Sequence, residues 1–523
     1  MGRPKRLYQN NFKLTVGYNQ EIKTNKSFNA SRLTLINSDT PMLSLATGSQ
    51  TVGDDATSWA VQGVFGRLHY DYDTKYLIDI NGRYDGSSKF AKGHRFALFP
   101  SVSAAWYLSH EEFMEGTSHI LSDLKLRGSY GSLGNQSIDG NFRYVPGYAI
   151  NRDQGYLIDG ARGVTVTAPG LVSADLTWEK VTQWNVAADF GFLQSRLNGS
   201  FDVFTRNTIG MLTASQPLPG VLGTNEPQAN AADMKTSGWE LELKWNDRIK
   251  SIDLDYHASF VLSDALAEIT KYDNPQGSLG SYYVGRKIGE IWGYESNGLF
   301  QSDAEIANAP SQTALATVTW LPGDVRYVDK NGDGFITSGK NTVDDHGDRS
   351  IIGNNTPRYQ YGITLGGAWK GFDLDIFLQG VGKRDWNPDG RFYGVNGRWD
   401  VPARDIGSYW TEKTPDGFLP KMYQDDEHTS ANRQTNSRYL QDASYLRFKQ
   451  LSLGYTLPAN LTRKASIDKV RVYFTGQNLF TWTKLSKMYD PEIIGTAARD
   501  TGVANNLSYP IAQAFSFGLN VTF

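Results

Sequence analysis

The feature that most constrains the fold is an alternation of apolar and polar residues that recurs along the chain. From Trp239 to Asn246, tryptophan or leucine alternates with a charged or amide residue. From Phe515 to Phe523, every second residue is likewise apolar. Successive side chains of a strand point to opposite faces of its sheet. The pattern therefore predicts an all-β fold whose strands have one apolar and one polar face.

Connections of two very different lengths separate these segments. A turn of two residues lies between Trp369 and Phe372, and Gln194–Ser195 and Asp71–Thr74 are similarly short links. Other links, such as 135–175 and 381–442, are long. Short turns at one end and long loops at the other are typical of outer-membrane β-barrels. We count about fourteen antiparallel strands of the length that a tilted transmembrane strand needs.

Two details of the last strands agree with a barrel. Leu446 and Phe448 share a face, and Leu451 and Leu453 then take that face over, so a β-bulge is expected near Lys449–Gln450. The sequence ends with Phe523 on an alternating segment. A terminal aromatic strand is common in outer-membrane barrels, although a soluble sheet can end in the same way.

Composition excludes several other classes. No apolar run approaches the roughly 18 residues of a membrane-spanning helix, whereas a barrel strand needs apolar residues at alternate positions only. Aromatic residues make up 13% of the chain and glycine contributes 53 residues, as expected for a barrel with aromatic girdles and tight bends. The net charge of −3 gives no reason to expect nucleic acid as a partner. Without cysteine there are no disulfides or thiolate sites.

Several segments together resemble the SusC/RagA family of TonB-dependent outer-membrane transporters. A late-strand signature, the strand after it and the loop beyond match in order, and three upstream segments continue the match. These segments are Asp442–Pro458, Val472–Phe480, Tyr489–Glu492, Gly66–Phe90, Phe99–Trp106 and Leu124–Gly131. The resemblance covers essentially the whole chain, and the combination is more specific than any one stretch.

The resemblance implies a 22-stranded transmembrane β-barrel filled by an N-terminal plug. Such a barrel works with a SusD-like lipoprotein lid and with the TonB complex to import glycans or peptides. We expect residues 1–523 to be a partial barrel domain, the C-terminal part, without a plug or a TonB-contact segment. An incomplete barrel has open sheet edges, so the chain should not transport alone. The expected location is the outer membrane of a Gram-negative bacterium of the Bacteroidota type.

One loop has the opening of an EF-hand calcium site. Oxygen-bearing side chains occupy positions 1, 3 and 5, namely Asp329, Asn331 and Asp333, and Gly334 occupies position 6. The twelfth position is Lys340 instead of glutamate, so Asp344 or Asp345 would supply the missing carboxylate after a small insertion, and Asp344 is the candidate ligand. Calcium is the one cofactor that the sequence suggests. The alternative is a plain acidic turn, because Asn-Gly and Asp-Gly are common turn dipeptides.

Four aromatic residues in the expected extracellular loops are candidates for substrate binding, because sugar rings stack on aromatic faces. They are Trp386, Tyr393, Trp399 and Trp410. The alternative is that they pack within the loops or the girdle.

No HExxH, GxSxG or P-loop pattern is present, so we do not expect an enzyme. Two other hypotheses remain. One is a surface glycan-binding protein or adhesin made of soluble β-domains, and the other is an outer-membrane lipase or protease barrel.

Overall fold

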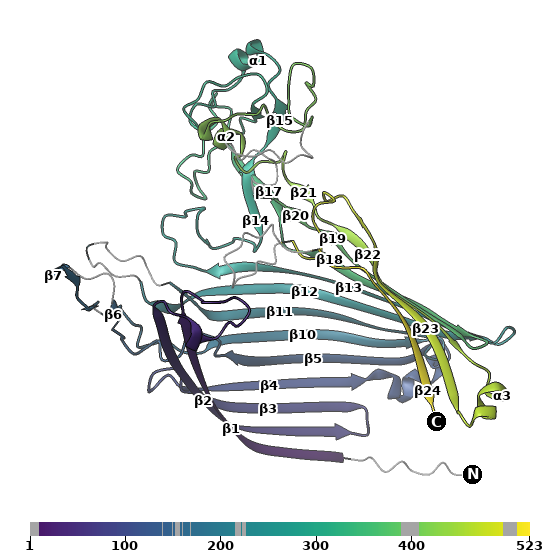
Figure 1. The fold of residues 1–523 in the computed structure, drawn as a ribbon. Coiled ribbons are helices and arrows are strands. Elements are labelled where there is room, and N and C mark those ends of the chain that lie inside the picture. The colour runs from purple at the N-terminus through teal and green to yellow at the C-terminus, as the bar shows by residue number, and fades with distance from the viewer. Residues whose placement is uncertain are drawn as a thin grey trace, which may run out of the picture. The chain divides into compact units, whose positions relative to one another are not determined.

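The computed structural model describes residues 10–138, 140–148, 150–151, 157–158, 160–167, 169–214, 221, 226–388, 407–494 and 510–523. Within them, one antiparallel sheet has fourteen strands (Figure 1). In sheet order the strands are β1 (Asn10–Arg32), β2 (Gln50–Tyr72), β3 (Tyr76–Ser87), β4 (Phe96–Tyr107), β5 (Leu121–Asn135), β10 (Glu179–Phe192), β11 (Leu197–Ala214), β12 (Gln228–Ile249), β13 (Leu254–Lys271), β18 (Arg358–Trp369), β19 (Phe372–Lys383), β22 (Tyr445–Thr456), β23 (Lys469–Thr483) and β24 (Ala514–Thr522).

The order of the strands follows the sequence, so each long strand pairs with its neighbour in the chain. The expected all-β antiparallel fold is confirmed. Among the described residues the sheet order is open, with β1 at one end and β24 at the other. The closed barrel of 22 strands therefore stays a prediction for the whole protein. In the described residues, no helix is long and apolar enough to cross a membrane.

The chain divides into two compact units. One comprises the described residues of Met1–Tyr107, Arg127–Val186 and Thr205–Lys235. The other comprises Leu108–Leu126, Ala187–Phe204 and Thr236–Phe523.

The predicted two-residue turn is present in the second unit. Trp369 pairs with Phe372, and Lys370 and Gly371 between them have φ angles of +47° and +89°. Positive φ at both central residues defines a type I′ turn, whose twist matches that of the flanking strands. The 369–372 sequence therefore specifies a tight hairpin between β18 and β19.

The alternation places apolar side chains on one face of each unit's strands. In the first unit, Leu68 of β2 pairs with Ile80 of β3, which pairs with Val102 of β4. In the second unit, Val472 of β23 pairs with Leu519 of β24. Because of this register, apolar residues pair with apolar residues on neighbouring strands within each unit.

The predicted bulge is confirmed. The register of β22 shifts between Phe448 and Gln450 against β23, and the β19 register shifts at the same place, between Phe377 and Leu378. Lys449 is the extra residue of β22, which restores Leu451 to the face that Phe448 occupied. A bulge also redirects side chains, and here it brings Arg447 and Lys449 to one loop, as described below.

Glycine allows one close approach on β24. The ring of Tyr473 lies over Gly518, and a Cβ at that position would be 2.1 Å from Cζ of the tyrosine. Any side chain at position 518 would displace the ring. An aromatic ring that covers a strand glycine supplies the packing surface that glycine itself lacks.

The two longest described connections of the second unit fold together into a separate loop core, which we call the loop domain (Figure 1). Its elements lie between β13 and β18 or between β19 and β22. They are β14 (Glu290–Tyr294), β15 (Ser296–Leu299), α1 (Asp303–Asn308), β16 (Val325–Tyr327), β17 (Arg349–Asn354), β20 (Asp385–Trp386), α2 (Asp426–Asn432) and β21 (Gln441–Asp442). Short strands β6 (Ile150–Asn151), β7 (Leu157–Ile158), β8 (Ala161–Arg162) and β9 (Thr165–Val166) lie in another loop, and α3 (Ala459–Thr462) lies between β22 and β23.

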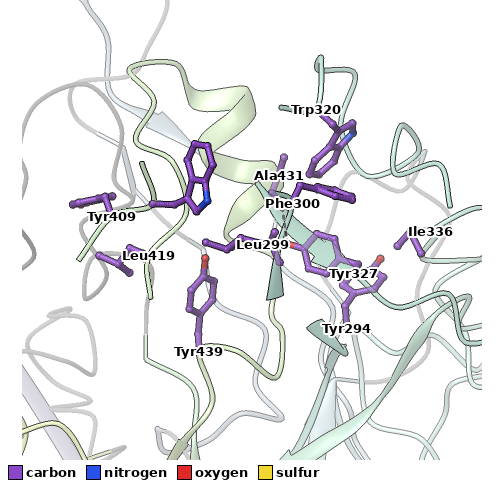
Figure 2. Close-up of a cluster of buried hydrophobic side chains, with 12 residues drawn as sticks. Tyr294, Leu299, Phe300, Trp320, Tyr327, Ile336, Tyr409, Leu419, Ala431 and Tyr439 are labelled. Carbon is purple, nitrogen blue, oxygen red and sulfur yellow. Dashed lines mark hydrogen bonds between the residues drawn. The ribbon is translucent and has the colours of Figure 1, made fainter. Parts of the chain in front are cut away.

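The core of the loop domain is aromatic (Figure 2). Phe300 and Tyr327 from the first connection are 1% and 2% exposed, and Leu419 from the second is 1% exposed. Tyr327 donates its hydroxyl to the carbonyl of Ala431, which joins the two connections at 2.8 Å. Buried aromatic and aliphatic groups of this size stabilise a fold by several kcal/mol each, about 1.5–3 per side chain.

Candidate functional site

The apolar face of the terminal strands is open to the surroundings. Leu14 of β1 is 71% exposed and Phe517 of β24 is 83% exposed. The opposite face is polar: in the first unit, Arg83 donates to Asp85 at 2.8 Å and to Asn19 at 3.1 Å. Large apolar side chains that stay exposed along whole strands mark a surface for an apolar environment. A transmembrane barrel presents such a surface to lipid.

In the acidic loop, residues 329–337, the acidic and amide side chains accept hydrogen bonds from the backbone of the same loop. Asp329 accepts the N–H groups of Gly332 and Gly334 at 2.6 and 2.9 Å. Asn331 and Asp333 accept the N–H groups two residues later in the same way. The hydrogen bonds from Gly334 and Gly332 favour the charged form and lower the pKa of the Asp329 carboxyl.

The carboxylate that closes this loop is Asp348, which sequence reasoning missed. It is fully buried and accepts the N–H groups of Lys330 and Thr337 at 2.8 and 2.7 Å. Asp344, the predicted fourth ligand, is exposed. Asp348 lies four residues further along the chain, and its only sequence signal is its acidic side chain.

The fit to calcium is incomplete. Calcium takes six to eight oxygen ligands, and the described residues contain no group of three or more His, Cys, Asp or Glu that could hold a metal ion. Calcium binding by Asp329, Asn331, Asp333 and Asp344 stays a prediction. A calcium titration followed by calorimetry tests it, with Asp344→Ala as the variant that should weaken binding if the predicted ligand set is right.

The two described residues of the predicted sugar-binding set, Trp386 and Trp410, belong to different buried clusters. Trp386 is 6% exposed and packs with Ala443, Leu485 and Ile494. Trp410 is 7% exposed in the loop-domain core, and its indole N–H donates to Gln301 at 3.0 Å. Tyr393 and Trp399 lie outside the described residues. Both described rings pack in buried clusters, Trp410 also lines a surface hollow, and sugar binding by the four residues stays a prediction.

A buried ion cluster, which we call the loop clamp, joins β22 to the loop that follows β23. Arg447 donates to Asp490 at 2.5 Å, to Glu492 at 2.6 Å and to the Thr481 hydroxyl at 2.9 Å. Lys449 donates to both oxygens of Glu492. The Arg447 and Asp490 side chains are 4% and 7% exposed. Because it is buried and fully paired, the clamp fixes the segment 484–494 against the sheet.

His428 of α2 connects the two halves of the loop domain. Its Nδ1 lies 2.9 Å from Asp425, its Nε2 lies 3.1 Å from the Thr319 carbonyl, and its ring stacks on Tyr423. Burial lowers its pKa, but the hydrogen bonds to Asp425 and Thr319 and the charges of Asp425 and Asp324 outweigh burial. The pKa of His428 is therefore above its ordinary value of 6.5. Only the protonated ring donates from both nitrogens.

The loop domain should consequently be more stable in mild acid than in mild alkali. With the folded pKa raised, the contribution of His428 is fully present below the unfolded pKa and is lost as the pH rises through the folded pKa. We expect a loss of about 1 kcal/mol or less for this partly exposed pair. Hydrogen exchange of the α2 amides at pH 5.5 and 8.5 measures it.

His428→Gln should abolish the part of this pH dependence that comes from the imidazole. His94→Gln is the control, because that imidazole lies 3.6 Å from Asp175 in the first unit. An undiminished pH dependence in His428→Gln would show that another group titrates.

Comparisons with known proteins agree with this architecture. The family described as "TonB dependent receptor-like, beta-barrel" matches residues 3–479. TonB-dependent receptor P3 of Formosa agariphila is 28% identical over 98% of this chain and 50% of its own length. TonB-dependent receptor SusC of Bacteroides thetaiotaomicron is 28% identical over 90% of this chain and 44% of its own length.

Among solved structures, the RagAB peptide transporter superposes with a TM-score of 0.77 at 25% identity. That match covers 98% of this chain and 53% of the other chain. The chain thus spans about half the length of the curated relatives that it matches. With a family match across most of its length and SusC among its relatives, the chain belongs to the family of TonB-dependent receptor-like β-barrels.

Proposed function

We propose that the protein carrying this chain imports an oligosaccharide or another large nutrient across the outer membrane. Residues 1–523 would form part of the barrel wall. The supporting observation is the band of exposed apolar side chains on strands whose other face is polar. Water disfavours such a band, whereas lipid accommodates it. Since the chain spans about half of its relatives' length, transport is proposed for the whole protein.

We propose the partners of this protein from its membership of the TonB-dependent receptor family. We propose a SusD-like lipoprotein lid outside the membrane and the TonB complex inside, with no role for nucleic acid. The named relatives come from Formosa agariphila and Bacteroides thetaiotaomicron, which supports an outer membrane of the Bacteroidota type. Glycan and peptide both remain candidate substrates, because one related structure is named as a peptide transporter. We propose no catalytic step.

The main competing function is a surface adhesin or glycan-binding protein without transport. A soluble sheet normally buries its apolar face against a second layer. Phe517 and Leu519 are instead exposed on the terminal strand. This observation favours the membrane protein over the soluble alternative.

Cell fractionation tests the proposal. An antibody against Ala514–Phe523 should detect the native polypeptide in outer membranes that have been washed with alkaline carbonate. Carbonate removes peripheral proteins, so a known peripheral protein of the same preparation serves as the control. Recovery of the polypeptide in the soluble fraction alone would rule out the barrel.

A further inference from the structure

The loop domain contains a surface hollow beside Trp410. The hollow has a volume of about 540 Å³ and is lined by residues from one segment, 409–422. They are Tyr409, Trp410, Thr411, Glu412, Lys413, Lys421 and Met422. Ligand sites have volumes of this order, with apolar walls and a few polar groups.

The floor of the hollow is held by backbone hydrogen bonds and by a close contact with Gly323. Trp410 donates its backbone N–H to Leu419 at 2.8 Å, and Leu419 donates to Ser408 at 2.9 Å. On another side the indole packs against Gly323, where a Cβ would lie 2.4 Å from Cε3 of the ring. Gly323 has a φ of +97°, which residues with a side chain rarely adopt. Any other residue at this position would therefore strain the backbone and collide with the indole ring. Because these residues are already ordered, less conformational entropy is lost when a ligand binds.

The rim of the hollow is cationic. Lys413 and Lys421 both line it, and in the described part of the chain neither ammonium group has an ion-pair partner. Lys421 lies with Nζ 5.8 Å from the centre of the Tyr423 ring, which holds the ammonium at the rim. Glu412 also lines the hollow, so its charged lining groups are two ammonium groups and one carboxylate. The hollow therefore combines apolar surface with a net positive charge.

We infer that this hollow binds an acidic sugar unit of the imported nutrient. The sugar ring would lie against Met422 and the small exposed parts of Tyr409 and Trp410, and its carboxylate or sulfate would contact Lys413 and Lys421. The inference rests on the proposed function and names the substrate class. An extended peptide fits less well, because peptide recognition commonly uses free backbone groups. The hairpin that forms the hollow uses the N–H groups of Trp410, Thr411, Thr414 and Gly417 internally.

Calorimetry with defined probes tests the inference on the purified, full-length protein. The acidic probes are trigalacturonate, which carries carboxylates, and a sulfated carrageenan tetrasaccharide. Maltotriose is the neutral probe and triglutamate is the acidic peptide. We expect an acidic sugar to bind, with an affinity that falls as salt increases, and the difference between the two acidic probes identifies the preferred anion.

The double variant Lys413→Gln, Lys421→Gln should weaken binding of the acidic sugar by about tenfold or more, since each charge-assisted hydrogen bond is worth more than a neutral one. Lys340→Gln with Lys464→Gln removes the same charge elsewhere and should leave the affinity unchanged. An equal loss in the control pair, tighter binding of maltotriose or triglutamate, or no binding of either acidic sugar would overturn the inference.

These results are independent of the membrane test. If the protein fractionates with the outer membrane but neither acidic sugar binds, the proposed transport stands and the sugar site fails. If the protein is soluble, transport fails whatever the hollow binds.

Discussion

Replacing Arg447 with methionine is expected to release the loop 484–494 from β22. The guanidinium is the only group that contacts Asp490, Glu492 and Thr481 together among the described residues. Removing the guanidinium leaves the buried Asp490 without a cationic partner, while Lys449 still pairs with Glu492, and an uncompensated buried charge costs about 3–5 kcal/mol. Methionine retains most of the side-chain volume, so the lost charge is the main change.

Limited proteolysis measures this release, because Lys484 and Lys487 lie inside the clamped loop. Trypsin should cleave after these lysines at least about a hundredfold faster in Arg447→Met, since each 1.4 kcal/mol is tenfold in the open population. Lys449→Met is the matched control and should have a much smaller effect, because Arg447 still holds Glu492.

A rescue variant separates charge from packing. Adding Asp490→Asn to Arg447→Met removes the carboxylate that has lost its cation, whereas Glu492 keeps its contact with Lys449, and should recover part of the protection. If Arg447→Met is cleaved no faster than the unaltered protein, the clamp does not hold the loop.

In the loop clamp, the sequence predicted the bulge of β22 but not the contacts of its side chains. The change of phase after Phe448 predicted the bulge, because period-two alternation reports the face on which each side chain lies. It did not predict that Arg447 would meet Asp490, which is more than forty residues away in the sequence. Alternation fixes the face of a strand residue and contains no information about which loop folds onto that face.

The aromatic loop residues show a second limit. The sequence predicts that Trp410 binds sugar, because a sequence does not distinguish an exposed tryptophan from a buried one in an irregular loop. The structure buries it because two long connections share one core. A core built from loops has no period of 2 or 3.6, so no pattern separates its inner from its outer residues. The strand positions were predictable, and the interior of the loop domain was not.

Asp348 provides the second large expected effect. Asp348→Ala removes the acceptor of two backbone N–H groups, those of Lys330 and Thr337, at a fully buried position. Both N–H groups are part-buried, so each loss should cost the lower part of the roughly 1–3 kcal/mol range for a buried donor without a partner. We expect the acidic loop to lose roughly 2–4 kcal/mol of local stability, measured as faster hydrogen exchange of the amides from Lys330 to Thr337.

Asp344→Ala is the matched control, because the same side chain is removed four residues away at an exposed position. A surface substitution of this kind should change stability by no more than about 0.5 kcal/mol. Asp348→Asn should fall between the two alanine variants, since the amide oxygen can still accept one of the two N–H groups. Equal effects of Asp344→Ala and Asp348→Ala would mean that the loop is held by its net charge and not by the buried carboxylate. We expect Asp348→Ala to be the most damaging variant and Asp344→Ala to be neutral. The reason is that water cannot easily take the place of the acceptor lost at the buried position 348.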